Sequence, residues 1–461
     1  MSNRKILIGL VAGCLVVMLC ACGVVLAAAT AGWVYADRTG WLSSPTPRPT
    51  RAPNATARPA PTPNAATLAE MDALGAWVTQ ARGLAPNTAG VQRKFLSADE
   101  VQDRTLQDFA EDSPPEEIAD SARSLTVLGL LDPAVDLNAL YLRLYSEGIA
   151  GFYDPDTGEL VVVSDAGQLN ISEKATYTHE YNHALQDQNY DLRGLGFSEE
   201  GWRADSEKAA AVQALLEGDA TLLEEQYMAT LSPLERLEYE RIVNSQDISI
   251  YYEIPDYLFQ DFLFPYRQGL EFVRRFYDAG GWARVDEVWR QPPASTEQIL
   301  HPELYDAGDL PLPVARVALT DTLGSGWREL ETNTMGEWYT YLILAYGTDS
   351  AARLDADQAQ PAAAGWGGDA YAVYYQDAQA QTVLTLHTRW DTLADAEEFG
   401  AAFVDYADAR FSRRVAIPNG RCWEGPELHC FFEKDAHTLW LAAPDQAQIT
   451  ALLALYPDLQ P

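Results

Sequence analysis

The sequence predicts an α+β protein with two folded domains behind a single transmembrane helix. Segments with apolar residues at helical spacing fill most of residues 68–330. From about residue 335 strands alternate with helices, which indicates a second, smaller α+β domain over residues 335–461. An uncharged apolar run precedes both domains, within residues 1–36.

The N-terminal segment has the features of a membrane anchor. After Arg4 and Lys5, no charged residue occurs in residues 6–36, which is long enough to cross a hydrocarbon core of roughly 30 Å as a helix. The basic residues before it and the acidic remainder after it place the N-terminus in the cytoplasm and the globular part outside. Cleavage of a signal peptide after the alanines at 27–29, or lipidation at Cys22, stays open. Because the apolar run continues past both sites, an uncleaved single-pass anchor is favoured.

A Pro-rich linker follows at residues 43–67. It consists mainly of Pro, Thr, Ala and Arg, with almost nothing to bury, and its prolines favour an extended polyproline II conformation. We therefore expect it to act as a stalk between the membrane and the folded part.

The first folded domain is expected to be mostly helical, with one hairpin. Ser172 is expected to be the N-cap of the helix that follows the hairpin. The predicted helices are residues 68–81, 97–131 with a break at Pro114 and Pro115, 137–146, 172–188, 204–231, and 257–276 with an interruption near Pro265, and the hairpin strands are residues 148–153 and 160–164. Residues 292–305 are expected to form a turn-rich loop with a short helical piece.

The second domain is expected to mix both element types. The pattern predicts helices at residues 335–346, 393–407 and from Gln446, with strands at 370–375, 383–387 and around Cys422, Cys430 and Leu439. Cys422 and Cys430 flank a turn-like WEGPEL stretch, so a hairpin disulfide is expected in an oxidising compartment. Two unpaired buried thiols are the alternative.

Composition excludes several classes of protein. The chain has 461 residues, of which 47% are hydrophobic, so it is not a disordered protein. Its formal net charge is -35, whereas proteins that bind nucleic acids need a basic surface. We therefore expect no nucleic-acid partner.

The segment HEYNH carries the clearest chemical signal. His179 and His183 are four residues apart in a predicted helix, so both imidazoles project from one face, about one turn apart. This spacing suits two corners of a tetrahedral zinc site. Glu180 points to the side of that face, where its carboxylate can take a proton from a metal-bound water.

A catalytic zinc needs a third protein ligand and leaves its fourth position to water. Glu217, in the sequence ALLEGDAT, lies among apolar residues on the next predicted long helix, and Gly218 removes bulk beside it. We expect Glu217 to be that ligand. Glu199, Glu200 and Asp205 are the competing acids.

In these motifs the chain resembles the gluzincin zinc peptidases, in which HExxH on one helix is completed by a Glu on a later helix. Segments such as GFYDPDTGELVV, HALQDQ and STEQILHP are similar to those of an uncharacterised subset of bacterial membrane-anchored proteins in this family. The resemblance implies a zincin-like metallopeptidase domain over residues 68–330 and one Zn²⁺ per chain. Gluzincins often have an Asp four residues after the ligand Glu, where this chain has Thr221. Asp219, Asp205 and Thr221 are therefore all candidates for orienting a ligand histidine.

A peptidase also benefits from a donor to the oxyanion that develops on the attacked carbonyl. His301 is the only other histidine before the second domain, and we assign it this role. Phenolic alternatives are provided by Tyr251, Tyr252, Tyr266 and Tyr305.

The sequence thus predicts a zinc-dependent peptidase that hydrolyses peptide bonds outside the cytoplasmic membrane, with Glu180 activating a zinc-bound water. Its expected partners are a peptide or protein substrate and the membrane, through the N-terminal helix. One alternative is a non-catalytic surface receptor or cell-wall-binding protein with a structural metal site. Another is a zinc hydrolase that acts on a non-peptide bond.

Overall fold

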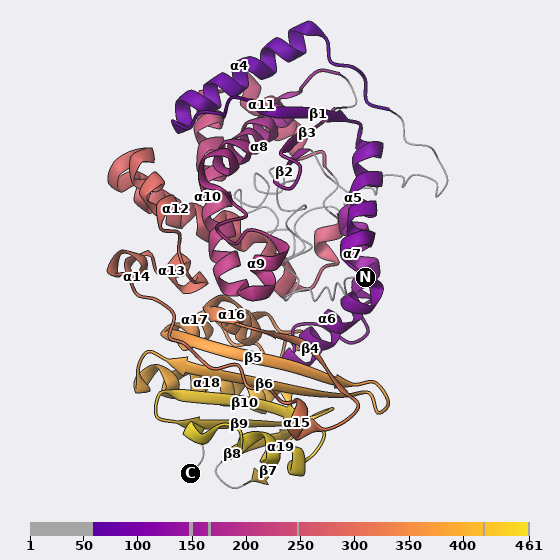
Figure 1. The fold of residues 1–461 in the computed structure, drawn as a ribbon, viewed down its shortest axis with the longest axis vertical. Coiled ribbons are helices and arrows are strands. Elements are labelled where there is room, and N and C mark those ends of the chain that lie inside the picture. The colour runs from indigo at the N-terminus through magenta and orange to yellow at the C-terminus, as the bar shows by residue number, and fades with distance from the viewer. Residues whose placement is uncertain (1–58, 147–150, 165–166, 247–248, 418–419, 460–461) are drawn as a thin grey trace.

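The computed structural model describes residues 59–146, 151–164, 167–246, 249–417 and 420–459 and has an α+β fold. A largely helical part carries a small sheet, and a second part is built on a large sheet (Figure 1). Within these residues no helix combines the length and apolarity needed to cross a bilayer. The expected anchor and most of the expected linker lie outside the described residues.

Helices dominate the described residues between 59 and 323. They are α4 (Ala65–Arg82), α5 (Ala98–Asp112), α6 (Pro115–Leu128), α7 (Leu137–Ser146), α8 (Ile171–Tyr190), α9 (Glu199–Ala204), α10 (Ser206–Thr230), α11 (Pro233–Val243), α12 (Asp256–Arg290), α13 (Thr296–Leu300), α14 (Pro302–Ala307) and α15 (Thr320–Leu323), with a 3-10 turn at Ser249–Tyr252. The predicted helices are confirmed, including the break before Pro115, except for the interruption predicted near Pro265. The end of the expected linker is already helical, because Asn64 caps α4 through hydrogen bonds from the N–H groups of Ala66 and Thr67.

A three-stranded sheet lies against α8. The predicted hairpin is formed by β2 (Gly151–Asp154) and β3 (Glu159–Val163), which pair in antiparallel fashion. β1 (Gln92–Leu96), which the sequence pattern did not reveal, pairs parallel to β3 on its other side. The order is β1-β3-β2, so β2 is an outer strand of this sheet, and it contacts α8.

The sequence predicted a break near Pro265, but α12 continues through this residue, so that prediction is wrong. The backbone of α12 is helical at this buried proline, and the non-helical angles occur at Gly280 (φ -166°, ψ 18°) and Gly281 (φ 66°, ψ -163°). Packing against α10 holds the helix around Pro265, and this contact is the most extensive between any two elements described. The left-handed φ of Gly281 is one that glycine adopts without steric cost, so the kink falls there.

The second part contains a seven-stranded antiparallel sheet. Its elements are β4 (Trp327–Asn333), α16 (Gly336–Tyr346), α17 (Ala356–Ala363), β5 (Trp366–Gln376), β6 (Gln381–Trp390), α18 (Leu393–Arg410), β7 (Arg413–Ile417), β8 (Gly420–Glu424), β9 (Leu428–Lys434), β10 (His437–Ala443) and α19 (Gln446–Leu453), with a 3-10 turn at Pro457–Leu459. The strand order is β4-β5-β6-β10-β9-β8-β7. Cys422 and Cys430 face each other across β8 and β9 and form the predicted disulfide, which is therefore confirmed.

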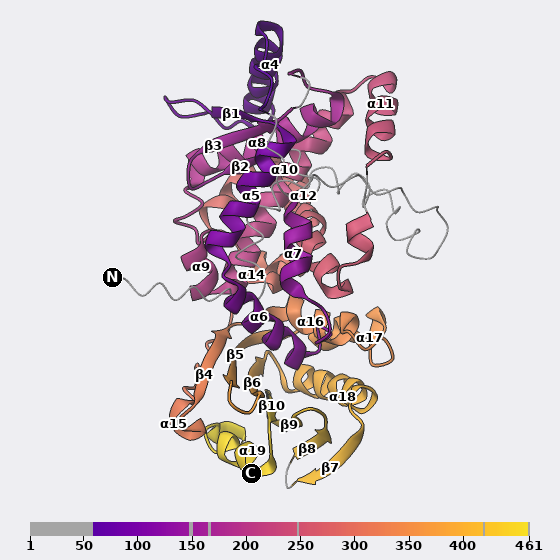
Figure 2. The same ribbon diagram turned by 90° about the vertical axis from the view of Figure 1, so that its right-hand side faces the viewer.

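Helices cover both faces of this sheet (Figure 2). Trp440 and Ala442 of β10 pack into the large core shared with α18, whereas Leu439 and Leu441 pack into a second core with α19. This alternation follows from the period of two in a strand.

The helical part and the sheet part are joined through α16. Phe264 of α12 stacks on Trp338 of α16 with ring centroids 4.5 Å apart, and Asp261 accepts hydrogen bonds from Trp338 and from Tyr339. On the other side of the joint, Arg410 of α18 donates to carbonyl groups at the end of α6. The large apolar core is continuous across both parts.

Candidate metal centre

Two histidines on α8 form one side of the candidate site. The rings of His179 and His183 pack edge to face, with centroids 4.7 Å apart, as expected for residues one turn apart. The prediction that Ser172 caps this helix is wrong. Asn170 is the N-cap, because its side-chain oxygen accepts from the N–H groups of Ser172 and Glu173. Glu173 returns a hydrogen bond to the N–H of Asn170 and completes a capping box.

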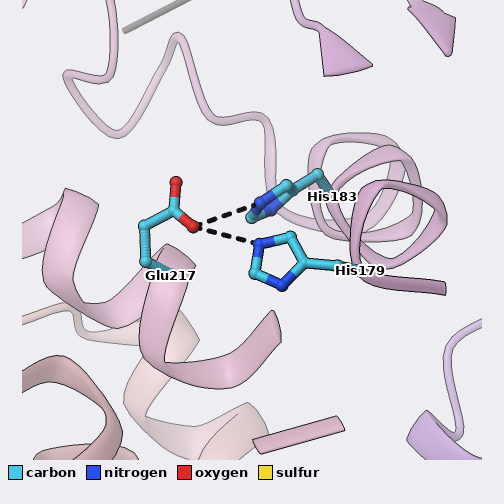
Figure 3. A group of neighbouring side chains, drawn as sticks. All are labelled: His179, His183 and Glu217. Carbon is cyan, nitrogen blue, oxygen red and sulfur yellow. Dashed lines mark hydrogen bonds and ion pairs between the residues drawn. The ribbon is translucent and has the colours of Figure 1, made fainter. Parts of the chain in front are cut away.

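Glu217 of α10 completes a triangle of ligand atoms (Figure 3). Its Oε2 atom lies 3.2 Å from Nε2 of His179 and 3.4 Å from Nε2 of His183. The ligand atoms all lie within 4.8 Å of one another, and all three side chains are buried. Ligand atoms around a tetrahedral zinc with bonds of about 2.0 to 2.1 Å are about 3.3 Å apart, so the spacing suits this ion.

The donor set also fits zinc in its chemistry. Two imidazole nitrogens and one carboxylate oxygen are ligands that zinc accepts, and one coordination position remains for water or substrate. Nε2 of His183 and Oε2 of Glu217, at 3.4 Å, are also close enough to bind one shared cation.

The competing acids do not approach this cluster. Glu199 and Glu200 are exposed on α9, where Glu199 pairs with Arg203. Asp205 is the exposed N-cap of α10. Of the acids considered from the sequence, the structure brings only Glu217 to the two histidines.

A second side chain orients each histidine ring through its Nδ1 atom. Oε2 of Glu224 lies 3.1 Å from Nδ1 of His179, and Oε1 of Gln186 lies 2.7 Å from Nδ1 of His183. Gln186 donates through its Nε2 to the carbonyl of Leu216, which leaves its oxygen to accept. Each Nδ1 therefore carries a proton, and Nε2 is the atom left for a metal.

These orienting groups differ from the sequence candidates. Asp219 accepts hydrogen bonds from other side chains, Asp205 caps α10, and Oγ1 of Thr221 makes no hydrogen bond within the described part of the chain. Glu224 was missed because it stands seven residues after Glu217. Two turns of helix bring these two residues onto one face, so helical spacing was the signal that could have found it.

Glu180 lies between the histidines and the small sheet. Its Oε2 accepts a hydrogen bond of 2.9 Å from the N–H of Tyr153 on β2, while its Oε1 makes none within the described residues. Burial raises the pKa of Glu180 well above its ordinary value, against the opposing effects of nearby His179 and of the Tyr153 N–H. One oxygen is thus held by the strand, and the other has no hydrogen bond to hold it.

The electrostatics of the cluster favour positive charge between its carboxylates. Burial alone would raise the pKa of Glu217, but the attraction of His183 and the hydrogen bonds from the histidines lower it to about 2. Burial also opposes protonation of His179, yet hydrogen bonds to Glu217 and Glu224 raise its pKa well above the ordinary value. A site that stabilises charge in this way is suited to a divalent cation.

Gly218 serves the packing of two helices. A Cβ atom on Gly218 would lie 2.2 Å from the carbonyl oxygen of Gly269 on α12, and one on Gly269 would lie 2.1 Å from the carbonyl oxygen of Ala214. α10 and α12 therefore cross in backbone contact immediately beside Glu217.

His301 lies between α13 and α14 and pairs with Glu337 of α16 through a contact of 2.9 Å. That hydrogen bond raises the pKa of His301. Of the phenolic alternatives, Tyr305 donates to the backbone carbonyl of Gln291. The ring centroid of Tyr266 lies 6.4 Å from that of His179. The role of His301 as an oxyanion donor stays a prediction.

Comparison with known families matches residues 322–453 to a domain of unknown function, DUF8575. The match covers all seven strands of the large sheet together with α16 to α19, and it excludes the candidate metal centre. No curated protein and no solved structure matches the chain.

Proposed function

We propose that this protein is a membrane-anchored zinc peptidase that hydrolyses peptide bonds outside the cytoplasmic membrane. The observation that carries the proposal is the convergence of His179, His183 and Glu217 on one point, with Glu180 beside them as an acid that is not part of the ligand triangle. Three ligands and a separate base are the set that metal-assisted hydrolysis requires.

The residues around the site have distinct roles in this proposal. His179, His183 and Glu217 would hold the ion, which supplies a Lewis acid that polarises both a water molecule and the scissile carbonyl. Glu180 takes the proton of that water through a carboxylate oxygen and later gives it to the leaving amine. The hydrogen bond from Tyr153 holds Glu180 in place during both transfers.

β2 supports a peptide as the substrate. The N–H of Tyr153 points away from β3, toward Glu180, and in an antiparallel strand the carbonyl of the same residue points to the same side. β2 is the outer strand, so its main-chain groups are directed toward the base. An extended peptide that pairs along this edge would present its backbone next to Glu180.

The arrangement also supports a zincin-like fold for the helical part. The pairing of α8 and α10 across the candidate metal, with a sheet whose outer strand borders α8, is the arrangement that the resemblance to gluzincins implies. The uncharged segment at residues 6–36 supports attachment to the membrane.

The test compares full-length wild type in detergent with Glu180→Gln and Glu217→Ala. We expect wild type to bind one zinc and to cleave an unfolded protein or a peptide library. Glu180→Gln should bind zinc but lose about 10²-fold or more of its activity, as is typical when a general base is removed. Glu217→Ala should lose zinc and activity together, whereas Glu199→Ala, on the exposed α9, should keep both.

Equal cleavage by wild type and Glu180→Gln would refute the mechanism even if zinc is bound. Stoichiometric zinc in Glu217→Ala would refute the ligand assignment. Zinc binding without any cleavage by wild type would favour a receptor with a structural metal site.

A further inference from the structure

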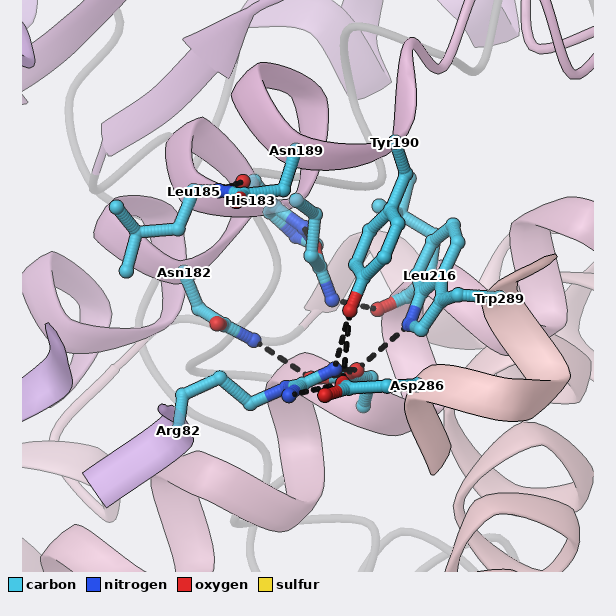
Figure 4. A network of polar contacts seen from close by, with 11 residues as sticks. Arg82, Asn182, His183, Leu185, Asn189, Tyr190, Leu216, Asp286 and Trp289 are labelled. Atoms are coloured by element: carbon cyan, nitrogen blue, oxygen red, sulfur yellow. Dashed lines mark hydrogen bonds and ion pairs between the residues drawn. The ribbon is translucent and has the colours of Figure 1, made fainter. Parts of the chain in front are cut away.

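A buried polar network joins α8 and α10 next to the candidate metal centre (Figure 4). Its centre is the carboxylate of Asp219, which accepts 2.9 Å and 2.8 Å hydrogen bonds from Nδ2 of Asn182 and from Nε1 of Trp289. Arg82 donates to both oxygens of this carboxylate through Nε and Nη2. Asp219, Asn182 and Arg82 are fully buried.

Asp219 is not placed to bind the metal. It stands two residues after Glu217, about 200° around the helix axis. Both of its oxygens are already engaged by donors from three other helices. Its carboxylate is therefore a fixed acceptor on a different face of α10 from the ligand Glu217.

Arg82 holds that acceptor in place from two directions. It is the last residue of α4, its Nη1 lies 2.7 Å from Asp286 of α12, and its guanidinium lies 4.4 Å from the ring centre of Trp282. Although burial lowers the pKa of Arg82, the charge and hydrogen bonds of Asp219 raise it above the ordinary value, so Arg82 stays charged. Asp219 is thus anchored by both α4 and α12.

Asn182 connects this anchor to the helix that carries the histidines. It immediately precedes His183, so its bond to Asp219 joins α8 to α10 directly beside a ligand. The other polar contacts between these helices involve the histidines themselves or Gln186, which donates to the carbonyl of Leu216. The bond from Asn182 differs from them because Asp219 is itself held by α4 and α12, so it fixes the rotation of α8 relative to the surrounding helices as well.

We propose that Asn182 and Asp219 are positioning residues that set the geometry at which Glu217 meets His179 and His183. The proposal rests on the metal centre proposed above. Stability alone does not account for Asn182, because its Oδ1 is buried and makes no hydrogen bond among the described residues. An apolar side chain of similar size would avoid the cost of burying that oxygen without a partner.

The test uses Asn182→Leu in the full-length protein, with Asn189→Leu as the matched control. Asn189 lies on the same helix but is exposed, and it donates only to carbonyls of α8 and of the segment after α4. Zinc affinity is measured by competition with a chelator, ligand geometry by the visible absorption of the protein loaded with Co²⁺, and folding by the thermal midpoint.

We expect Asn182→Leu to weaken zinc binding about 10- to 100-fold and to change the Co²⁺ spectrum. Its thermal midpoint without metal should stay close to that of wild type, and Asn189→Leu should match wild type in affinity and spectrum. If Asn182→Leu does not fold, Asn182→Ala, which introduces no bulk, takes its place with the same expectations.

Wild-type zinc affinity and an unchanged Co²⁺ spectrum in the variant would overturn the positioning role. A lower thermal midpoint with unchanged metal properties would also overturn it, because the network would then serve stability alone. If wild type itself binds neither Zn²⁺ nor Co²⁺, the proposed metal centre is wrong, and the positioning role falls with it. Loss of peptidase activity alone is not a criterion in this test.

Discussion

Oε2 of Glu224 lies 3.1 Å from Nδ1 of His179. Glu224 stands seven residues after Glu217 on the same helix, α10. One face of α10 thus contacts both nitrogens of a single imidazole, Nε2 through Glu217 and Nδ1 through Glu224. A carboxylate on the outer nitrogen fixes the orientation of the ring and raises its basicity toward a metal.

We therefore expect Glu224→Gln to lower zinc affinity about 10- to 100-fold, because the amide is a weaker acceptor and lacks the negative charge. Competition with a chelator measures this loss. Glu225→Gln is the control, since Glu225 pairs on the surface with Arg274 and does not face the site. If both variants keep wild-type affinity, Glu224 does not support His179.

The crossing of α10 and α12 gives a second prediction. Gly218→Ala and Gly269→Ala should each lower the free energy of unfolding by about 1 to 3 kcal/mol, because each methyl group overlaps backbone of the opposite helix. The double variant should cost less than the sum, since one separation of the helices relieves both overlaps. Denaturant unfolding measures all three. Strict additivity would mean that the two glycines do not share one contact.

Much of the candidate site could be predicted from the sequence because the patterns that indicate it are local. His179, Glu180 and His183 needed only a helical period, and Glu217 needed only an acid among apolar residues on the next helix. Arg82 gave no such signal. It lies 137 residues from Asp219, and only the packing of α4 against the other helices brings the two together.

The errors in the fold prediction have similar causes. Pro265 has the stronger local tendency to break a helix, but packing between α12 and α10 overrides it, and the kink moves to Gly281. β1 was missed because QRKFL has no clear alternation and becomes a strand only through pairing with β3. The cap at Ser172 was misplaced by two residues because Asn170 is an equally good cap.

The membrane topology can be tested on intact cells. If residues 6–36 form an uncleaved anchor, added protease should release a soluble fragment that begins within the Pro-rich stretch 43–58. Cleavage beyond residue 60 is not expected, because the N–H of Ala60 donates to Glu100 and α4 begins at Ala65. N-terminal sequencing of the fragment provides the measurement. A mature protein that already starts at Thr30 before protease is added would show that the segment is a cleaved signal.

Two buried acids at the joint between the helical part and α16 predict how stability depends on pH. Oε1 of Glu207 accepts hydrogen bonds from the N–H and the hydroxyl of Thr296, and its other oxygen lies against Gly336 at the start of α16. Burial raises the pKa of Glu207 to about 8, although the bonds from Thr296 oppose this shift. Burial and the nearby carboxylate of Glu337 raise the pKa of Glu297 to about 9.

The sign of the effect follows from these directions. Both folded-state pKa values lie above the ordinary value of 4.5, so the folded protein binds protons that the unfolded chain has released. The stability from this source is fully present below about pH 4.5 and is lost as the pH rises to about 8 for Glu207 and about 9 for Glu297. Over that interval each group lowers the free energy of unfolding by about 1.4 kcal/mol per pH unit.

We therefore expect the thermal midpoint of the wild type to fall between pH 5 and pH 9, as measured by calorimetry or circular dichroism. Glu207→Gln mimics the protonated acid and should reduce the slope up to about pH 8, because one titrating group is gone. The net charge of -35 also disfavours the compact state at high pH, so Glu398→Gln on the surface of α18 serves as a control that removes the same charge. A slope in Glu207→Gln equal to that in Glu398→Gln would show that general repulsion, and not the buried acid, governs the pH dependence.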